Sequence, residues 1–249
     1  MVSRTELDSY LATLLEVGRF RDYGPNGLQV EGKPEVCKIV SGVTASLALI
    51  DAAIACRADA VLVHHGLFWK GHDGRVTGWL KQRLERLLAR QINLFAYHLP
   101  LDAHAEFGNN AQFGARIGVT ADARFGEQDL GFIGTADPSI SAQALTEKLQ
   151  QVLGRSATLV AGDGRPLRRL AWCTGGAQSY FEAAIAAGAD AFVTGEISEP
   201  QAHYAIETGV AFIACGHHAS ERFGAAALGA HVALRFGIEH QFIEIDNPA

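Results

Sequence analysis

The hydrophobic residues of the first half of the chain recur at helical spacing and then in short runs. Four leucines within residues 4–18 predict an amphipathic helix: Leu7, Leu11, Leu14 and Leu15. Apolar runs predict buried strands at 38–43, 58–63 and 92–97, and other segments predict helices at 46–57, 77–90 and 107–117. Strands and helices that alternate in this way are typical of a parallel sheet. The segment 120–140 has weak periodicity and many Gly and Asp residues, so we expect an irregular connection there.

A short stretch occurs twice in the chain. Residues 52–60 read Ala-Ala-Ile-Ala-Cys-Arg-Ala-Asp-Ala, and residues 183–191 read Ala-Ala-Ile-Ala-Ala-Gly-Ala-Asp-Ala. Each copy follows a predicted strand with a Gly-containing turn, and each precedes another apolar run. We therefore predict an α/β fold with an internal duplication: a first half at 1–118, a connecting segment at 119–164 and a second half at 165–249. Two related halves that face each other would form one site at their interface.

Histidines and acids gather where the predicted strands end. His64 and His65 close the strand at 58–63, and His98 follows the strand at 92–97. In the second half, His217 follows an apolar run at 210–214. The carboxyl ends of parallel strands are the usual place for sites in α/β proteins. Imidazole and carboxylate side chains are common ligands of metal ions in proteins. The predicted metal ligands are His64, His65, His98, Asp102, His217 and Glu221.

The local spacing of these residues adds three expectations. Adjacent His64 and His65 would point to opposite sides if the strand pleat continues, so that one segment could serve two ions. His217 and Glu221 are four residues apart and would share one face of a helix. Pro100 disfavours a helix after His98, so we expect a loop there.

Six protein ligands exceed what one catalytic ion usually takes, so we expect two divalent ions per chain. The mixture of nitrogen and oxygen donors favours Fe, Zn, Mn, Co or Ni over Ca or Mg. Two ions bring four positive charges, of which the two carboxylates remove two, so the pocket would attract a small anionic or phosphorylated ligand.

Two further residues are candidates for proton transfer. Two polar turns elsewhere in the chain are explained first by their role in reversing the chain direction. Glu196 stands where the repeat would place His65, and His104 lies just beyond Asp102. The turn at 174–179 resembles an anion-binding turn but lacks the lysine of a P-loop. The turn at 24–27 has side chains that could line a pocket.

Composition limits the classes of partner. The 249 residues are 48% hydrophobic and 19% charged, and the net charge is −6. No Lys/Arg-rich run is present, which disfavours a nucleic-acid-binding ring. No apolar run approaches the length of a membrane helix and no signal sequence opens the chain, so we expect a cytoplasmic protein without a membrane partner. The four cysteines form no C-x-x-C pair, and we expect buried single residues without disulfides.

Several motifs together resemble one known family. They are Asn26-Gly27-Leu28-Gln29-Val30, Val63-His64-His65-Gly66, His98-Leu99-Pro100-Leu101-Asp102, Asn109-Asn110, Thr194-Gly195-Glu196 and Gly216-His217-His218-Ala219-Ser220-Glu221-Arg222. From about residue 20 to the C-terminus the chain resembles the short bacterial members of the Nif-three-like dinuclear-metal family, often called GTP cyclohydrolase 1 type 2 homologues. The resemblance implies a toroidal homohexamer and two metal ions held by the six ligands named above. The connection at 120–165 is too short for the extra domain of the longer members.

We expect a two-metal hydrolase that acts on a nucleotide or another phosphorylated small molecule. Cyclohydrolase chemistry on GTP ranks below generic hydrolysis, because nothing in the sequence identifies a purine pocket. The alternative is a non-enzymatic hexameric protein that binds or delivers metal or serves as a regulatory scaffold.

Overall fold

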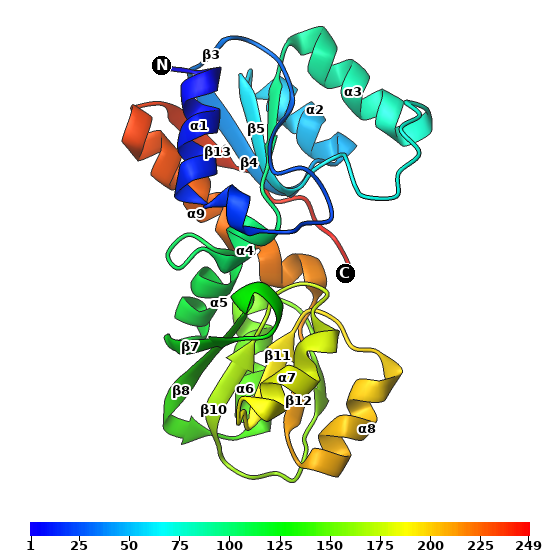
Figure 1. The fold of residues 1–249 in the computed structure, drawn as a ribbon, viewed down its shortest axis with the longest axis vertical. Helices are drawn as coiled ribbons and strands as arrows, with labels where there is room; N and C mark the ends of the chain where they lie inside the picture. The colour runs from blue at the N-terminus through cyan, green and yellow to red at the C-terminus, as the bar shows by residue number, and fades with distance from the viewer. The chain divides into compact units, whose positions relative to one another are not determined.

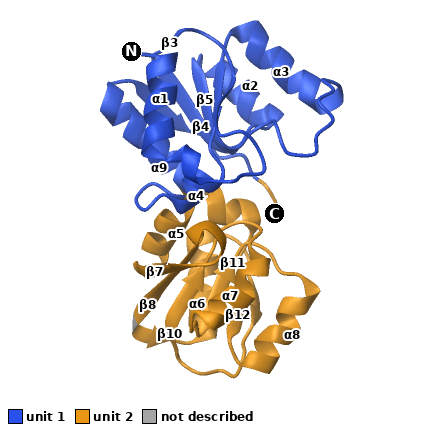
Figure 2. Cartoon of the chain, viewed as in Figure 1, with its two compact units in different colours: residues 1–108, 224–246 blue, residues 109–223, 247–249 orange. Residues whose placement is uncertain are grey.

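Strands and helices alternate along the chain in the computed structural model, which describes residues 1–136 and 138–249 (Figure 1). These residues form two compact units (Figure 2). The first unit contains Met1–Gly108 and Gly224–Asp246, and the second contains Asn109–Phe223 and Asn247–Ala249. This division cuts the chain differently from the predicted segments 1–118, 119–164 and 165–249, because the last strand pairs with the first sheet.

The first unit is built on a five-stranded sheet with the order β13-β4-β5-β6-β2. Its strands are β2 (Gly27–Val30), β4 (Lys38–Thr44), β5 (Ala60–His65), β6 (Asn93–Ala96) and β13 (Glu239–Phe242). Strands β13, β4, β5 and β6 run parallel, and β2 pairs antiparallel with β6. The three strands predicted in this region are confirmed. Strands β1 (Val2–Ser3) and β3 (Glu35–Val36) form a separate antiparallel pair.

Helices cover both faces of this sheet, because successive side chains of a buried strand point to opposite sides. Helices α2 (Leu47–Ala55) and α3 (Gly78–Arg90) pack on the face that carries Val61 and Val63 of β5. Helix α1 (Arg4–Leu14) and the later part of α9 (His217–Phe236) pack on the face that carries Ala60 and Leu62. In Figure 1, β4 and β5 lie between these two pairs of helices.

The second unit is built on a six-stranded sheet with the order β7-β8-β10-β11-β12-β9. Its strands are β7 (Ala121–Phe125), β8 (Gly131–Ile140), β9 (Thr158–Val160), β10 (Leu167–Trp172), β11 (Ala191–Thr194) and β12 (Ala211–Ala214). Strands β10, β11 and β12 run parallel, and the other pairs are antiparallel. The expected irregular connection at 120–140 is wrong, since β7 and β8 pair there. A register shift between Ala121 and Ala123 interrupts the two-residue period that identifies a strand.

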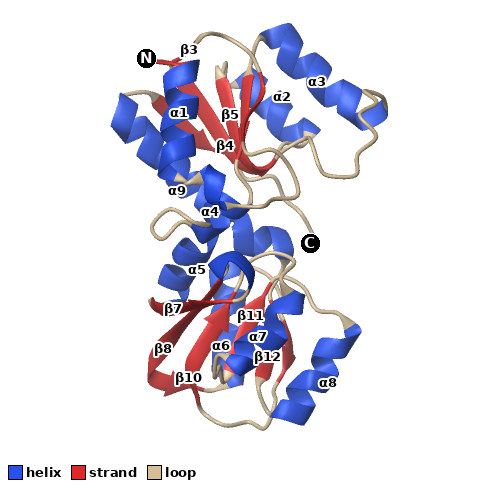
Figure 3. Cartoon of the chain, viewed as in Figure 1, coloured by secondary structure: helices blue, strands red, loops and turns tan.

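Helices flank this second sheet as well (Figure 3). They are α5 (Asn109–Ile117), α6 (Ala142–Leu153), α7 (Phe181–Ala186) and α8 (Glu199–Thr208). Helices α5 and α6 pack against Trp172 and Val193 in one core. On the opposite face, Phe181 of α7 contacts Phe192 and Phe212, with ring centroids 6.0 and 4.9 Å away. The helix predicted at 107–117 is thus confirmed as α5.

The aspartate of the repeated stretch makes the same backbone contacts in both units. A carboxylate oxygen of Asp59 accepts from the amides of residues 37 and 38, at 2.9 and 3.1 Å. A carboxylate oxygen of Asp190 accepts from the amides of residues 168 and 169, both at 2.9 Å. Each aspartate therefore ties the start of one parallel strand to the start of the next. The two units share the order strand-helix-strand-helix-strand (β4 to β6, β10 to β12), and the duplication itself stays a prediction.

Serine residues cap the first two long helices. Helices α1 and α2 begin at Ser3 and Ser46, whose hydroxyls accept hydrogen bonds from backbone amides of the first turn.

The cysteines are free, and Cys173 and Cys215 are buried, whereas Cys37 is exposed, contrary to expectation. Within residues 1–136 and 138–249, no helix combines the length and the apolar character needed to span a membrane.

Replacing Asp59 with Asn should lower stability in a pH-dependent way. Burial alone would raise the pKa of Asp59, but Lys33 and the two strand amides lower it below the usual 3.8. A lowered pKa in the folded state contributes stability above that value, and the contribution is lost as the pH falls through the folded pKa. We expect Asp59→Asn to cost about 1–3 kcal/mol near neutral pH. Urea unfolding across the acid range measures this difference, which should shrink below pH 3.8.

The matched control is Asp51→Asn, since Asp51 pairs with Arg86 on the surface without capping a strand. An equal loss of stability at neutral and acid pH for Asp59→Asn would contradict the assignment.

Candidate metal centre

Three histidines of the first unit converge at one edge of its sheet. Strand β5 ends at His65, and β6 is followed two residues later by His98. Because β5 and β6 are parallel neighbours, their carboxyl ends lie together. His64, His65 and His98 each present one ring nitrogen, and these nitrogens all lie within 4.8 Å of one another. This is a cluster that could hold a metal ion.

The adjacent histidines do not diverge as the strand pleat predicted. The ring centroids of His64 and His65 are 4.5 Å apart, and that of His98 lies 4.9 Å from the ring of His64. Both residues lie in β5, at its carboxyl end. His64 is buried and His65 is half-buried, which places the cluster at the edge of the core.

Asp102 joins this cluster from a short helix. Residues Leu99–Ala103 form α4, so the loop expected after His98 is wrong. Pro100 lies in the first turn, where a helix needs no amide hydrogen from it. The amide of Asp102 donates to the carbonyl of His98 at 3.1 Å, and its Oδ1 lies 3.5 Å from Nε2 of His64.

The two histidine rings of β5 are held through Nδ1. Nδ1 of His64 lies 3.0 Å from the carbonyl oxygen of Tyr97. Nδ1 of His65 lies 3.1 Å from the hydroxyl of Thr44 in β4. These contacts occupy the nitrogen nearer the backbone and leave Nε2 as the nitrogen for a ligand. Metal-binding histidines typically show this arrangement.

His98 is held in the same way, but by a carboxylate that the sequence interpretation missed. Nδ1 of His98 lies 2.7 Å from Oδ1 of Asp22, whose side chain is 3% exposed. Asp22 also accepts from the amide of Tyr23, the side chain of Asn26 and the amide of Leu99. Burial alone would raise the pKa of Asp22, but the His98 ring, Asn26 and the amide of Tyr23 lower it. The polar turn at 24–27, which the sequence singled out, adjoins Asp22 and holds it through Asn26.

In the second unit, His217 and Glu221 lie one turn apart at the start of α9, as predicted. Nε2 of His217 is 3.1 Å from Oε2 of Glu221, and its Nδ1 is 2.6 Å from Oε1 of Glu196. The hydrogen bond with Glu221, opposed by burial and helped by Glu196, raises the pKa of His217 to about 9. Both ring nitrogens of His217 therefore lie next to carboxylate oxygens, Nε2 beside Glu221 and Nδ1 beside Glu196.

The turn that follows β10 packs directly on this pair. Gly175 has a φ of +73°, and a Cβ there would overlap the carboxylate of Glu221. The amide of Gly175 donates to the hydroxyl of Ser220 at 3.0 Å, and its carbonyl accepts from Thr194 at 3.0 Å. The polar turn noted at 174–179 thus supports the acid of the candidate site.

His104, the other proton-transfer candidate, caps a turn. Its Nδ1 accepts from the amides of Glu106 and Phe107, at 3.2 and 3.0 Å. Its ring stacks on Phe107 with centroids 5.1 Å apart. A role for His104 in proton transfer stays a prediction.

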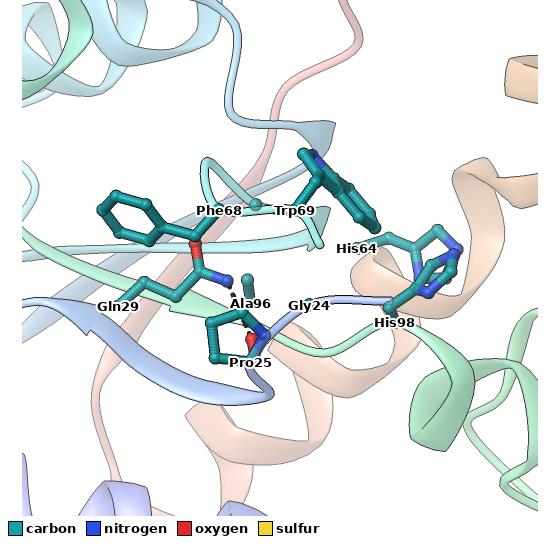
Figure 4. Close-up of a pocket in the computed structure, with 9 residues that line it drawn as sticks. Gly24, Pro25, Gln29, His64, Phe68, Trp69, Ala96 and His98 are labelled. Atoms are coloured by element: carbon teal, nitrogen blue, oxygen red, sulfur yellow. Dashed lines mark hydrogen bonds between the residues drawn. The ribbon is translucent and has the colours of Figure 1, made fainter. Parts of the chain in front are cut away.

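A small pocket lies beside His64 and His98 in the first unit (Figure 4). Its volume of about 10 Å³ is the room of one water molecule. Gln29 closes one side: its amide donates to the carbonyl of Pro25 at 2.8 Å, and its side-chain oxygen accepts from the amide of Leu67 at 2.8 Å. The pocket therefore supports the histidines and does not accommodate a substrate.

Comparison with known proteins gives a consistent result. A family model described as Duf34/NIF3 (NGG1p interacting factor 3) matches residues 2–248. A protein of Pseudomonas aeruginosa named GTP cyclohydrolase 1 type 2 homolog is 49% identical, with 98% of this chain and 96% of the relative covered. A protein of Neisseria meningitidis with the same name is 48% identical over all of both chains.

Solved structures agree with these relatives. The structure of protein ybgI, described as of unknown function, superposes with a TM-score of 0.96 at 45% identity and full coverage of both chains. A protein from Thermus thermophilus gives a TM-score of 0.91 at 34% identity, again over both whole chains. With a family model that spans almost every residue and relatives that match from end to end, the chain belongs to the Duf34/NIF3 family.

Proposed function

We propose that this protein is a dinuclear metal-dependent hydrolase that acts on a nucleotide or another phosphorylated small molecule. The ions would be held by the six ligands expected from the sequence, His64, His65, His98, Asp102, His217 and Glu221. The observation that supports this most strongly is shared by the four histidines of the set. Each has Nδ1 occupied by an oxygen of the protein, so each offers Nε2.

The donor chemistry fits first-row transition metals. Imidazole nitrogens with carboxylate oxygens suit Zn, Fe, Mn, Co or Ni, whereas Ca and Mg prefer oxygen alone. Bound divalent ions supply Lewis acidity that polarises a phosphoryl or carbonyl oxygen and activates water. The chain itself orients the histidine rings, and the acceptor oxygens beside His64, His98 and His217 favour a proton on Nδ1 of each. Glu196 contacts His217 directly and is therefore placed to hold that proton rather than to touch substrate.

The names of the relatives support hydrolysis as the reaction class, since a cyclohydrolase opens a ring with water. We do not extend the proposal to GTP. The pocket beside His64 and His98 has a volume of about 10 Å³, the size of one water molecule, which leaves no room for a purine there.

The expected charge balance needs a correction. Asp22 and Glu196 contact His98 and His217, so the proposed centre contains four carboxylates and not two. Four negative charges balance two divalent ions, and attraction of an anion then needs another source. Arg155 is such a source: its guanidinium packs against Gly216, the residue before His217. No residue within 1–136 and 138–249 forms a hydrogen bond or ion pair with that guanidinium.

The toroidal homohexamer implied by the family resemblance belongs to the same proposal. A native mass near six times the 26.6 kDa chain, by light scattering, would support it.

Metal content is the first test. Protein purified without chelator or affinity nickel should contain about two transition-metal ions per chain by elemental analysis. His65→Ala should lose most of the metal while remaining folded, and Glu221→Gln should retain metal less well and hydrolyse less. His203→Ala is the matched control, because His203 pairs with Glu199 on the surface. Normal metal content in both site variants would contradict the assignment, and saturated metal without turnover would favour the scaffold alternative.

Gly175→Ala should remove metal without changing any ligand. The added methyl group would displace the Glu221 carboxylate, so we expect at least a tenfold loss of affinity, on the order of one lost ligand contact. Competition with a chromophoric chelator measures it. Gly188→Ala is the control, since Gly188 has a similar φ of +80° and nothing within 4 Å of an added Cβ. Equal effects of the two substitutions would mean that backbone strain, not displacement of Glu221, is responsible.

Arg155→Met should weaken binding of inorganic phosphate to the zinc-loaded protein. A charge-assisted hydrogen bond contributes about 1.5–3 kcal/mol, so the affinity should fall about tenfold or more. Calorimetric titration with phosphate measures the loss. Arg168→Met, at an exposed position of the same unit, should leave the affinity unchanged. If both variants bind phosphate like the wild type, Arg155 does not recognise the anion.

A further inference from the structure

We propose that Asp22 and Glu196 are positioning residues that set the metal affinity of His98 and His217, one carboxylate-backed histidine in each unit. The inference rests on the proposed function, because it assigns the role of residues that contact proposed ligands. The family model and the names of the relatives assign no role to either carboxylate.

The four histidines fall into two kinds by what holds Nδ1. His64 and His65 contact a neutral carbonyl and a neutral hydroxyl. His98 and His217 contact carboxylates, at 2.7 and 2.6 Å. A carboxylate on one ring nitrogen fixes the tautomer and makes the other nitrogen a stronger donor. His98 and His217 are thus the two stronger ligands.

Asp22 is held in place independently of any ligand. Its Oδ2 accepts from Asn26 Nδ2 at 2.8 Å and from the amide of Leu99 at 2.9 Å. Asn26 in turn accepts from the amide of His98 through its side-chain oxygen, at 2.7 Å. Asn26 therefore holds the backbone of His98 and Asp22 holds its ring, and together they fix the direction of Nε2.

Glu196 is held more loosely and faces solvent. Its side chain is 45% exposed, and Oε2 accepts a long hydrogen bond of 3.3 Å from Gln178. The same side-chain nitrogen of Gln178 also donates to the hydroxyl of Ser198, at 3.3 Å, and Ser198 is the residue that caps α8. Replacing Glu196 therefore changes the charge on His217 with little effect on packing, which makes it the cleaner of the two tests.

The experiment compares zinc affinity, measured by competition with a chromophoric chelator, in Asp22→Asn and Glu196→Gln. We expect both variants to bind zinc about 10–100-fold more weakly than the wild type. The controls are Asp8→Asn and Glu199→Gln. Asp8 accepts the amide of Leu28 and contacts no proposed ligand, and Glu199 pairs with a surface histidine. Both controls should bind zinc within about twofold of the wild type.

The visible spectrum of the cobalt-loaded protein adds a readout that general destabilisation does not shift. Both site variants should change the cobalt bands, and both controls should keep them. If Asp22→Asn does not fold, Glu196→Gln decides the question alone. Wild-type affinity and an unchanged cobalt spectrum in Glu196→Gln would overturn the inference while leaving the proposed function intact. A wild-type protein that binds no zinc and no cobalt would overturn both.

Discussion

Parallel strand pairing is the constraint on which the candidate centre depends. In the first unit, the register between β5 and β6 sets His64 and His65 beside His98, although these segments are far apart in the sequence. In the second unit, the register between β11 and β12 sets Glu196 beside His217. A slip of one residue in either pair would turn a donor into the core or away from its partner. Asp59 and Asp190 stabilise this pairing at the opposite ends of the strands.

Close backbone approach is the second requirement, and it explains glycines that carry no chemistry. A Cβ at Gly66 would overlap the amide of Gln29, which bridges the turns on both sides of the histidine cluster. A Cβ at Gly24 would overlap the carbonyl of Phe68. Side chains would separate these turns, and the rings they support would lose their fixed direction. The glycines beside a proposed ligand are therefore needed for close packing of the turns, whereas the ligand itself is needed for its chemistry.

The parallel strands β4, β5 and β6 and the candidate ligands that follow strands could be predicted from the sequence, because apolar runs and the polar residues after them are local features. The helix α4 was missed because a proline near its start was taken as a helix breaker. The hairpin of β7 and β8 was missed because a register shift disturbs its alternation. Asp22 was missed for a different reason: it meets His98 only through the tertiary fold, and no spacing in the sequence relates the two.

The supporting carboxylates change what kind of centre the ligands would make. With Asp22 and Glu196 counted, two divalent ions in the proposed centre would be close to charge-balanced, so net charge would not retain an anion. Binding would then depend on open positions at the ions and on directed donors such as the guanidinium of Arg155. A neutral centre also releases a doubly charged product such as phosphate more readily than a strongly positive one. Turnover of a phosphorylated substrate would need this release, whereas metal storage would not, so such a charge balance would be compatible with the proposed hydrolase.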